Sequence, residues 1–268
     1  MKFIHLTDPH LTAKGDLFDV DVDGQLRAAV ASINARHADA QLVMITGDIA
    51  HWGETGAYDR ARAIFQTLKM PWYPLIGNHD DRDAFFAGLP AAMCDDQGRA
   101  CFRLDVEAGT FLALDTLIEG THAGRIDADQ LAWLEKQLAE LTGAAFIFMH
   151  HPPMLSGING MDNIRLQNPD DLAAVLARHP GKVRHLFFGH MHRAFHGSWN
   201  GLPFSTVKAT AHQIAAVFDS GLPLMSSREL PNYAVVLISP ETVAIHDVSY
   251  LEEDTEFDYN RDYGRAET

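Results

Sequence analysis

Five short apolar runs in this sequence each end in polar side chains of the kind that bind metal ions. The runs are nearly all apolar, which is typical of strands buried on both faces. We expect strands at Phe3–Thr7, Leu42–Thr46, Trp72–Ile76, Ala144–Met149 and Val183–Phe188. Helical patterns lie between them, at about residues 24–38, 55–69, 127–141 and 169–179. This alternation of strands and helices predicts an α/β fold.

The residues that follow these runs are carboxylates, imidazoles and one amide. Asp8 and His10 follow the first run, Asp48 the second, Asn78 and His79 the third, His150 and His151 the fourth, and His190 and His192 the fifth. In open α/β sheets the carboxyl ends of the strands face one crevice, where ligands bind. A single motif of this kind is usually a turn or a hydrogen-bonded structural residue. Five together predict one shared metal site.

The residue types limit the metals that such a site can take. Imidazole and carboxylate suit Zn, Fe, Mn or Co, and the motifs contain no thiolate for an iron–sulfur cluster. Two ions about 3.5–4 Å apart can hold both the attacking and the leaving oxygen of a phosphoryl displacement. Such a pair needs a bridging carboxylate, for which Asp48 is the natural candidate. The two metal ions would lower the pKa of bound water and so supply hydroxide near neutral pH. The motifs therefore predict a two-metal phosphoester hydrolase.

The charge of the chain restricts its partners. A formal net charge of −15 repels long polyanions, and no Lys/Arg cluster forms a stripe for nucleic acid, so we expect a small anionic substrate and no nucleic acid partner. No apolar run approaches the length of a membrane span, and Asp8 interrupts the N-terminus before a signal-peptide core could form. We therefore expect a cytoplasmic protein without membrane contact, in which Cys94 and Cys101 are free thiols.

The pattern of the chain changes after about residue 200. Two β segments, Tyr233–Ile238 and Val243–Val248, predict a second sheet packed on the first. Because 268 residues can form one large domain, we expect a single domain over residues 1–268, with its core in 1–200 and its second-sheet strands, cap and tail in 201–268. The acidic tail is expected to be a solvated, flexible end.

Taken together, the motifs resemble the full signature of calcineurin-like metallophosphoesterases. The residues that carry the resemblance are Asp8-x-His10, Gly47-Asp48, Gly77-Asn78-His79-Asp80, His150-His151-Pro152-Pro153 and Gly189-His190-x-His192. The resemblance implies a four-layer αββα sandwich of two mixed sheets flanked by helices, with a small cap or dimerisation segment. Segment 81–101 and the region after residue 200 exceed what the motif-bearing core needs. We expect them to form that cap and to make the chain self-associate.

The resemblance also implies how the seven ligands divide between two metal ions, which would be Fe, Mn, Zn or Co, divalent or of mixed valence. One ion would take Asp8, His10, Asp48 and His192, and the other would take Asp48, Asn78, His150 and His190. His79 would be the catalytic residue, near the phosphate or the leaving group. His151 would be a neighbour of the ligands.

Departures from sister families narrow the resemblance. Purple acid phosphatases carry a tyrosine three residues after the Gly-Asp aspartate, where this chain has His51. Ser/Thr protein phosphatases carry a phosphate-binding arginine after that aspartate, which is lacking here. The stretch Gly77-Asn78-His79-Asp80-Asp81, with Gly160-Met161-Asp162 further on, is closest to a bacterial subgroup. That subgroup contains class III cyclic-nucleotide phosphodiesterases and glycerophosphodiesterases.

The resemblance therefore implies a phosphodiesterase for small diesters, either 3′,5′-cyclic nucleotides or glycerophosphodiesters. His51, Asp162 and His212 are candidates for substrate contacts, and Trp52 either stacks on a substrate base or seals the sheet. The alternatives are a broad phosphomonoesterase or nucleotidase on the same metals, and a non-catalytic metal-containing scaffold. The presence of all seven ligands and of His79 argues against the scaffold. The sequence has no Gly-x-Ser-x-Gly elbow, P-loop or dinucleotide loop for other chemistries.

Overall fold

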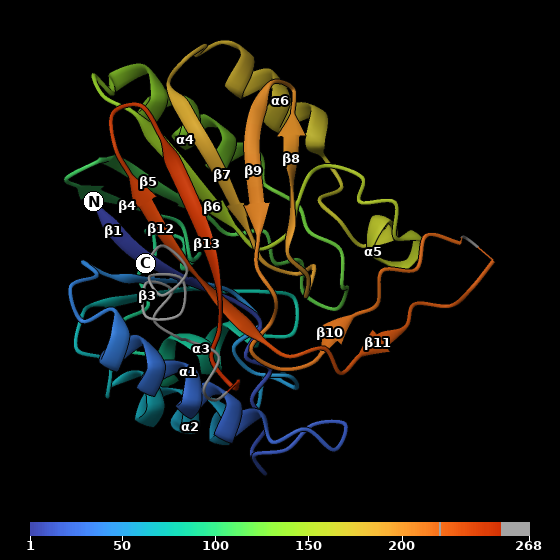
Figure 1. Cartoon of the computed structure of the whole chain (residues 1–268). Coiled ribbons are helices and arrows are strands. Elements are labelled where there is room, and N and C mark those ends of the chain that lie inside the picture. The colour runs from blue at the N-terminus through green and yellow to red at the C-terminus, as the bar shows by residue number, and fades with distance from the viewer. Residues whose placement is uncertain (220, 253–268) are drawn as a thin grey trace, which may run out of the picture.

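Two mixed sheets form the middle of the molecule, and helices cover their outer faces (Figure 1). The computed structural model describes residues 1–219 and 221–252. The first sheet runs in the order β13 (Val243–Ser249), β12 (Asn232–Ile238), β1 (Lys2–Leu6), β2 (Val43–Thr46) and β3 (Trp72–Leu75). The second runs in the order β4 (Phe102–Val106), β5 (Gly109–Leu114), β6 (Ala145–Met149), β7 (Val183–Phe188), β9 (Leu202–Thr206) and β8 (Phe195–Trp199).

The helices form the two outer layers. The first sheet is covered by α1 (Val22–Arg36), α2 (Thr55–Phe65) and α3 (Arg82–Gly88), and the second by α4 (Ala128–Glu140) and α6 (Pro169–Ala177) (Figure 1). Local sequence sets where they begin. Asp21 accepts a hydrogen bond from the Gly24 N–H at the start of α1, and Asp127 accepts one from the Gln130 N–H at the start of α4. Pro169 begins α6, where its missing N–H costs nothing.

Aromatic side chains fill the space between the two sheets. Because successive residues of a strand face opposite sides, Phe3 of β1 points toward the second sheet while Ile4 and Leu6 point toward the helices. The ring of Phe3 meets Phe111 and Phe187 edge-on, with centroids 5.1 and 5.5 Å away. Burial of one such ring stabilises the fold by about 1.5–3 kcal/mol.

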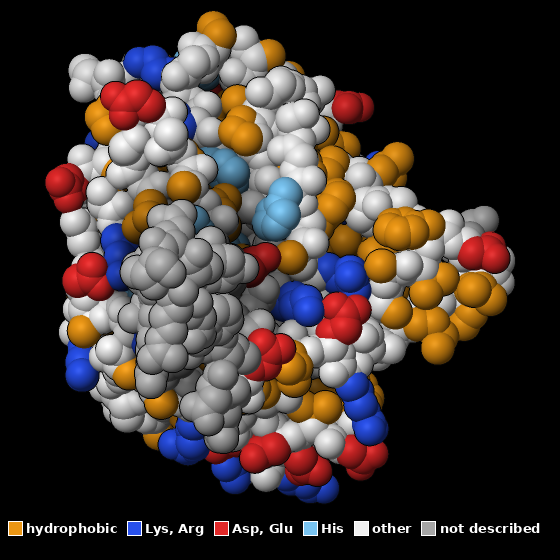
Figure 2. Space-filling view, viewed as in Figure 1, with side chains coloured by type: hydrophobic (Ala, Val, Ile, Leu, Met, Phe, Trp, Pro, Cys, Tyr) orange, Lys and Arg blue, Asp and Glu red, His pale blue; other side chains and the backbone are white. Residues whose placement is uncertain are grey.

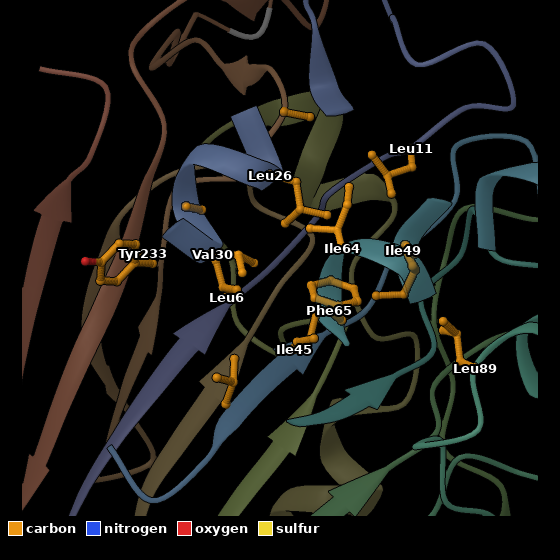
Figure 3. Packing of buried hydrophobic residues seen from close by; sticks show 14 of the residues in the cluster. Leu6, Leu11, Leu26, Val30, Ile45, Ile49, Ile64, Phe65, Leu89 and Tyr233 are labelled. Atoms are coloured by element: carbon orange, nitrogen blue, oxygen red, sulfur yellow. The ribbon is translucent and has the colours of Figure 1, made fainter. Parts of the chain in front are cut away.

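A second apolar layer holds the helices against the first sheet (Figure 3). Leu26 of α1 and Phe65 of α2 are fully buried, and they share one cluster with Leu6 of β1 and Ile45 of β2. The expected four-layer αββα architecture is confirmed.

The expected composition of the second sheet is wrong. Segments Tyr233–Ile238 and Val243–Val248 belong to β12 and β13, which extend the first sheet. The reason is that β12 pairs antiparallel with β1, with Ile4 opposite Val235. The second sheet consists of β6 and β7 with four further strands, so residues on both sides of position 200 contribute to the core.

Segment 81–101 is also not a cap. Its helix α3 packs on α2, and Phe85 and Leu89 are fully buried in the core beneath. Cys94 is an exposed free thiol, and Cys101 is a buried one. The acidic tail beyond Glu252 lies outside the described residues.

One projection stands out from the molecule, on the right of Figures 1 and 2. It runs from β10 (Gln213–Ile214) to β11 (Ser226–Ser227), beside the short helix α5 (Asn159–Asn163), and we call residues 213–227 the arm. Exposed hydrophobic side chains gather on it, among them Phe218, Leu222, Leu224 and Met225. The arm is packed closely on α5, because a Cβ added at Gly160 would lie 2.7 Å from the Leu224 Cβ.

Within the described part of the chain, no helix is long and apolar enough to cross a membrane.

Candidate metal centre

The predicted ligands lie in loops that follow parallel strands. Asp8 and His10 follow β1, Asp48 follows β2, Asn78 follows β3, His150 follows β6, and His190 and His192 follow β7. Strands β1, β2 and β3 are parallel neighbours, and so are β6 and β7. Parallel strands end at the same edge of their sheet, and the two sheets pack face to face, so the loops of both sheets meet. The structure brings all seven side chains together.

One carboxylate oxygen lies between two histidine nitrogens. The Oδ2 atom of Asp48 is 3.5 Å from Nε2 of His10 and 3.3 Å from Nε2 of His150. On the His10 side, Oδ1 of Asp8 is 3.3 Å from Nε2 of His192. The ligand atoms of Asp8, His10, Asp48 and His192 all lie within 4.8 Å of one another, and all four side chains are buried. Asp48 therefore lies close to histidines on both sides of the centre.

The other side of Asp48 gathers a second group. Ligand atoms of His150, His151 and His190 also lie within 4.8 Å of one another. Oδ1 of Asn78 lies 3.2 Å from Nε2 of His150. His151 is engaged at both nitrogens, because Nδ1 lies 2.7 Å from the Thr116 hydroxyl oxygen and Nε2 lies 3.1 Å from the His122 carbonyl oxygen. His151 is thus tied to the surrounding loops, as expected for a neighbour of the ligands.

Hydrogen bonds from behind orient the ligand rings. Nδ1 of His150 donates to the Thr46 carbonyl at 2.7 Å, and Nδ1 of His192 donates to the His212 carbonyl at 2.8 Å. A carbonyl can only accept, so each neutral ring carries its proton on Nδ1 and presents a bare Nε2 to the centre. Oδ2 of Asp8 accepts from the Thr7 hydroxyl at 2.5 Å and from the His190 N–H at 3.0 Å, which leaves Oδ1 for the centre.

The residues at the centre fit metal ions. Oδ1 of Asp8 and Nε2 of His190 are buried and have no hydrogen-bond partner. The Nε2 atoms of His10 and His192 face each other at 2.9 Å. Buried polar atoms without partners are costly and rare in folded proteins, and cations placed among them would satisfy these atoms. All the donors are nitrogen or oxygen, which suits Zn, Fe, Mn or Co.

The carboxylate of Asp48 and the neighbouring histidines shift one another's pKa values. Burial alone would raise the pKa of the Asp48 carboxyl, but His150 and His79 beside it hold that pKa well below its usual range. Burial opposes a charge on His150, yet Asp48 outweighs it and raises the pKa of His150 to about 9. Burial holds the pKa of His190 well below its usual range. Asp48 is therefore an ionised carboxylate at neutral pH.

Five of the predicted ligands have a backbone conformation that residues other than glycine rarely adopt. The φ angles are 51° at Asp8, 45° at His10, 53° at Asp48, 68° at His190 and 48° at His192. Such conformations cost about 1–3 kcal/mol each and cluster at functional sites, where the surrounding structure holds them. This backbone conformation directs the five side chains toward the centre.

Asp80 belongs to the motif Gly77-Asn78-His79-Asp80, but the sequence analysis gave it no role. Its buried carboxylate accepts hydrogen bonds from the N–H groups of Gly77, Ile49 and Ala50, at 2.9, 3.1 and 2.9 Å, and from the Tyr58 hydroxyl at 3.0 Å. Burial and the charge of Asp48 raise its pKa to about 7, although the backbone donors oppose this. Asp80 ties the loop of Asp48 to the loop of Asn78.

His122 is a residue of the site that the sequence analysis missed. It lies in the loop between β5 and α4, where its Nδ1 is 3.1 Å from Nδ2 of Asn78. Its ring centroid lies 5.0 Å from that of His79. The usable signal was β5 itself, because this strand is parallel to β6 and its loop therefore opens at the same edge. Without β5 in the prediction, His122 was one histidine among many.

A cavity of about 210 Å³ opens onto the predicted ligands. His79 lines it, together with His51 and His212. Nδ1 of His79 donates to the His51 carbonyl at 2.9 Å. Burial, followed by the neighbouring histidines, lowers the pKa of His51 to about 4 and that of His212 to about 3. A larger cavity, of about 550 Å³ between α6 and the β8–β9 hairpin, is mostly apolar in its lining.

The two remaining candidates for substrate contacts, Asp162 and Trp52, do not line this cavity. Asp162 accepts hydrogen bonds from the Ser156 N–H and hydroxyl, both at 2.7 Å, and from the Gly157 N–H at 3.1 Å. Its carboxylate organises its own loop, so any effect of Asp162 on a substrate passes through that loop. Trp52 is 65% exposed and sits edge-on against His51, outside the cavity lining, so it does not seal the sheet.

Comparison with known families agrees with this geometry. The family model described as calcineurin-like phosphoesterase matches residues 1–194, which contain every predicted ligand. The chain belongs to this family. The phosphoesterase is similar to a probable cyclic nucleotide phosphodiesterase of Rhodopseudomonas palustris, with 40% identity over 256 residues that cover 94% of this chain and 93% of the relative.

Two further likenesses extend the comparison. A glycerophosphodiester phosphodiesterase of Enterobacter lignolyticus is 30% identical over 221 residues, which cover 80% of this chain and 79% of the relative. Among solved structures, a dimetal phosphatase from Danio rerio superposes on the phosphoesterase with a TM-score of 0.73, over 94% of this chain and 97% of that one. At 15% identity that likeness concerns the fold alone.

Proposed function

We propose that this phosphoesterase hydrolyses small phosphodiesters, 3′,5′-cyclic nucleotides or glycerophosphodiesters, at a centre of two metal ions. The observation that carries the proposal is the position of Asp48, whose Oδ2 lies between Nε2 of His10 and Nε2 of His150. The ligand sets that follow are Asp8, His10, Asp48 and His192 for one ion, and Asp48, Asn78, His150 and His190 for the other. Two such ions would supply hydroxide near neutral pH and neutralise charge on the phosphate.

The charge of the cavity favours a diester over a monoester. Two divalent ions would bring about +4, which the carboxylates of Asp8 and Asp48 and the attacking hydroxide would together reduce to about +1. No Lys or Arg is among the described residues that line the cavity. Arg193, which follows the last motif, donates to the Ile214 carbonyl at 2.6 Å and to Glu229 at 2.9 Å. A singly charged diester is therefore better matched than a dianionic monoester, which would need a further cation.

His79 is placed to handle a proton. The His51 carbonyl keeps the proton of a neutral His79 on Nδ1, so Nε2 is the nitrogen free for the substrate. From Nε2 the protonated ring would donate to a phosphate oxygen or to the leaving alkoxide. His122 and Asn78 adjoin it in the same cavity, and the bond between them aims the Asn78 oxygen at His150.

We further propose that two copies of the chain associate through the arm. Phe218, Leu222, Leu224 and Met225 expose apolar surface there, and Asp219 is the one charged residue in segment 213–227. In a chain with a net charge of −15, a segment with a single charged residue adds little to the repulsion between two copies. Light scattering at micromolar concentrations should show a dimer that Leu222→Glu and Met225→Glu together dissociate. A wild type that stays monomeric would contradict this.

The function is tested by metal analysis of the purified protein and by a panel of substrates. We expect two ions per chain and a higher kcat/KM for bis(p-nitrophenyl) phosphate than for p-nitrophenyl phosphate with the same metal. His51→Ala should weaken diester hydrolysis more than monoester hydrolysis, because His51 lines the cavity where the second ester group must lie. A monoester advantage of tenfold or more would replace the diesterase with a phosphomonoesterase.

A further inference from the structure

A strained turn at the rim of the cavity is left unexplained by the metal centre. Residues Phe18 and Asp19 form a two-residue turn, in which the Leu17 N–H donates to the Val20 carbonyl at 2.9 Å and the Val20 N–H donates back at 2.8 Å. Their φ angles are 51° and 60°. Positive φ at both central residues defines a type I′ turn, which strongly prefers Asn-Gly. A bulky residue such as phenylalanine is an outlier in this conformation.

The chain contains a turn of the same kind with the preferred residues. Asn200 and Gly201 join β8 to β9 with φ angles of 51° and 81°. Among the described residues other than glycine, eight have positive φ: five are predicted metal ligands, one is Asn200, and the other two are Phe18 and Asp19. Phe18 lines the same cavity as four of the five strained predicted ligands, which are His10, Asp48, His190 and His192.

Packing does not explain why phenylalanine stands at position 18. Its neighbours Leu17 and Val20 pack on the hydrophobic core, but the ring of Phe18 is 58% exposed. The ring meets His51 and His212 edge-on, with centroids 5.7 and 5.2 Å away. An exposed ring gains little from burial, so both the backbone and the solvent disfavour this placement. Strain that the fold does not need points to a role in function.

The cavity beneath the ring suits a ligand with an apolar, planar part. Phe18 lines the same cavity as His79 and the predicted ligands. The lining also contains the apolar side chains of Met161, Ile164, Ile214 and Leu224. Trp52, the aromatic residue that the sequence suggested for stacking, does not line this cavity. The structure offers Phe18 in its place.

We propose that the ring of Phe18 stacks on the planar base of a nucleotide diester held at the metal centre. The inference rests on the proposed function and narrows it to diesters that carry a base, such as 3′,5′-cyclic nucleotides, over glycerophosphodiesters. An aromatic side chain stacks on the π-face of any base and contributes roughly 5- to 100-fold to binding. A glycerophosphodiester without a base has no planar group to stack, so Phe18 gives it no comparable gain.

The test compares kcat/KM for 3′,5′-cyclic AMP and for glycerophosphoethanolamine, which has no base. Phe18→Asn should lower the ratio of the two values by roughly 5- to 100-fold, mainly through KM for cyclic AMP. The same variant should raise the melting temperature, because asparagine is favoured in this turn. Phe18→Tyr keeps the ring and should keep the ratio.

Two further variants are matched controls. Asp19→Gly relieves strain in the same turn without removing the ring, so it should raise the melting temperature and leave the substrate ratio unchanged. Asn200→Phe places phenylalanine in the remote turn, so it should lower the melting temperature and leave the ratio unchanged. A fall in melting temperature for Phe18→Asn without a change in ratio would make Phe18 a structural residue and overturn the inference, as would equal losses for both substrates.

A binding measurement separates this inference from the proposed function. If the metal-loaded wild type hydrolyses neither diester, the proposed function fails. The inference is then decided by adenosine 5′-monophosphate and inorganic phosphate, whose binding can be measured by calorimetry. Phe18→Asn must weaken binding of the nucleotide relative to phosphate. Equal binding changes for the two ligands would overturn it.

Discussion

The imidazole rings of His51 and His79 are stacked, with centroids 4.7 Å apart and planes 20° apart. The two residues come from loops that follow neighbouring strands, β2 and β3. The backbone of His51 also holds Nδ1 of His79, so one residue fixes both the plane and the proton of the other. His79 is therefore oriented before any substrate arrives.

Replacement of His79 should affect turnover without affecting the metals. General acid catalysis typically contributes about 10²–10⁴-fold, so His79→Ala should lose roughly that much in kcat. The variant should retain its metal content, since Nδ1 bonds to a carbonyl and the ring is not among the predicted ligands. Elemental analysis and steady-state kinetics on the same preparation check both parts. Loss of an ion, with activity restored by excess metal, would make His79 a ligand.

Replacement of Asp48 should weaken both metal sites, and replacement of Asn78 should weaken one. Asp48→Ala removes the oxygen that lies between His10 and His150, so we expect less than one ion per chain after dialysis. Asn78→Ala should mainly empty the site that it shares with His150 and His190. Inductively coupled plasma analysis of the dialysed proteins measures this. Turnover at the wild-type rate by chelated, metal-free protein would rule out the mechanism.

Asp80 should matter for stability more than its single carboxylate suggests. Asp80→Ala leaves three buried N–H groups and the Tyr58 hydroxyl without their acceptor, and each unsatisfied group costs about 1–3 kcal/mol. We expect a loss of about 4–5 kcal/mol in urea unfolding, the low end of that sum, because the groups around the substituted residue can relax. Tyr58→Phe is the comparison variant, because it keeps the carboxylate. It removes one of the same hydrogen bonds and also the acceptor of the Asp81 N–H, so it should cost about 1–3 kcal/mol. Similar losses for both variants would show that Asp80 does not hold the two loops together.

His185 should make the fold sensitive to acid. Burial in β7 lowers its pKa to about 4, from an ordinary value of 6.5. The unfolded chain binds the proton more readily than the folded one, so this contribution is complete above about pH 6.5 and is lost as the pH falls toward 4. Between pH 7.5 and 5 the loss is about 2 kcal/mol.

The measurement is urea unfolding of the metal-free protein at the two pH values. His185→Gln retains a partner for Ser205 and removes the titrating group, so its stability should fall about 2 kcal/mol less than that of the wild type. Parallel losses in both proteins would assign the acid sensitivity to other groups.

The meeting of the predicted ligands at one edge was predictable because their signal is local. Asp8 and His150 follow their apolar runs directly, and Asp48 follows its run after one glycine. Parallel strands bring such residues to one edge of the sheet. The pairing of β12 was not predictable in this way. Lys2 lies opposite Leu237, and the apolar alternation of a strand does not name its partner. The apolar pattern of segments Tyr233–Ile238 and Val243–Val248 thus predicted two strands correctly but assigned them to the wrong sheet.

Other parts of the site gave little signal in the sequence. Arg103 and Asp105 are exposed on β4, so the sequence of this strand does not look apolar. The hairpin from β4 to β5 was therefore missed, and with it the loop after β5 that contains His122. Phe18 and Asp19 occupy a type I′ turn, which usually contains Asn-Gly, so the sequence pattern does not predict a turn at these residues. The ring becomes noticeable only when its φ angle and its position over the cavity are seen together.

The positive φ angles of the predicted ligands have a consequence for how this protein can change over generations. At Asp8, His10, Asp48, His190 and His192, glycine or asparagine would relax the backbone, so selection for stability alone opposes the residues that are there. A descendant that no longer needed the reaction would gain stability by drifting at these positions first. In a lineage of this chain, the order in which ligands disappear would then record the loss of activity, with glycine and asparagine as its earliest marks.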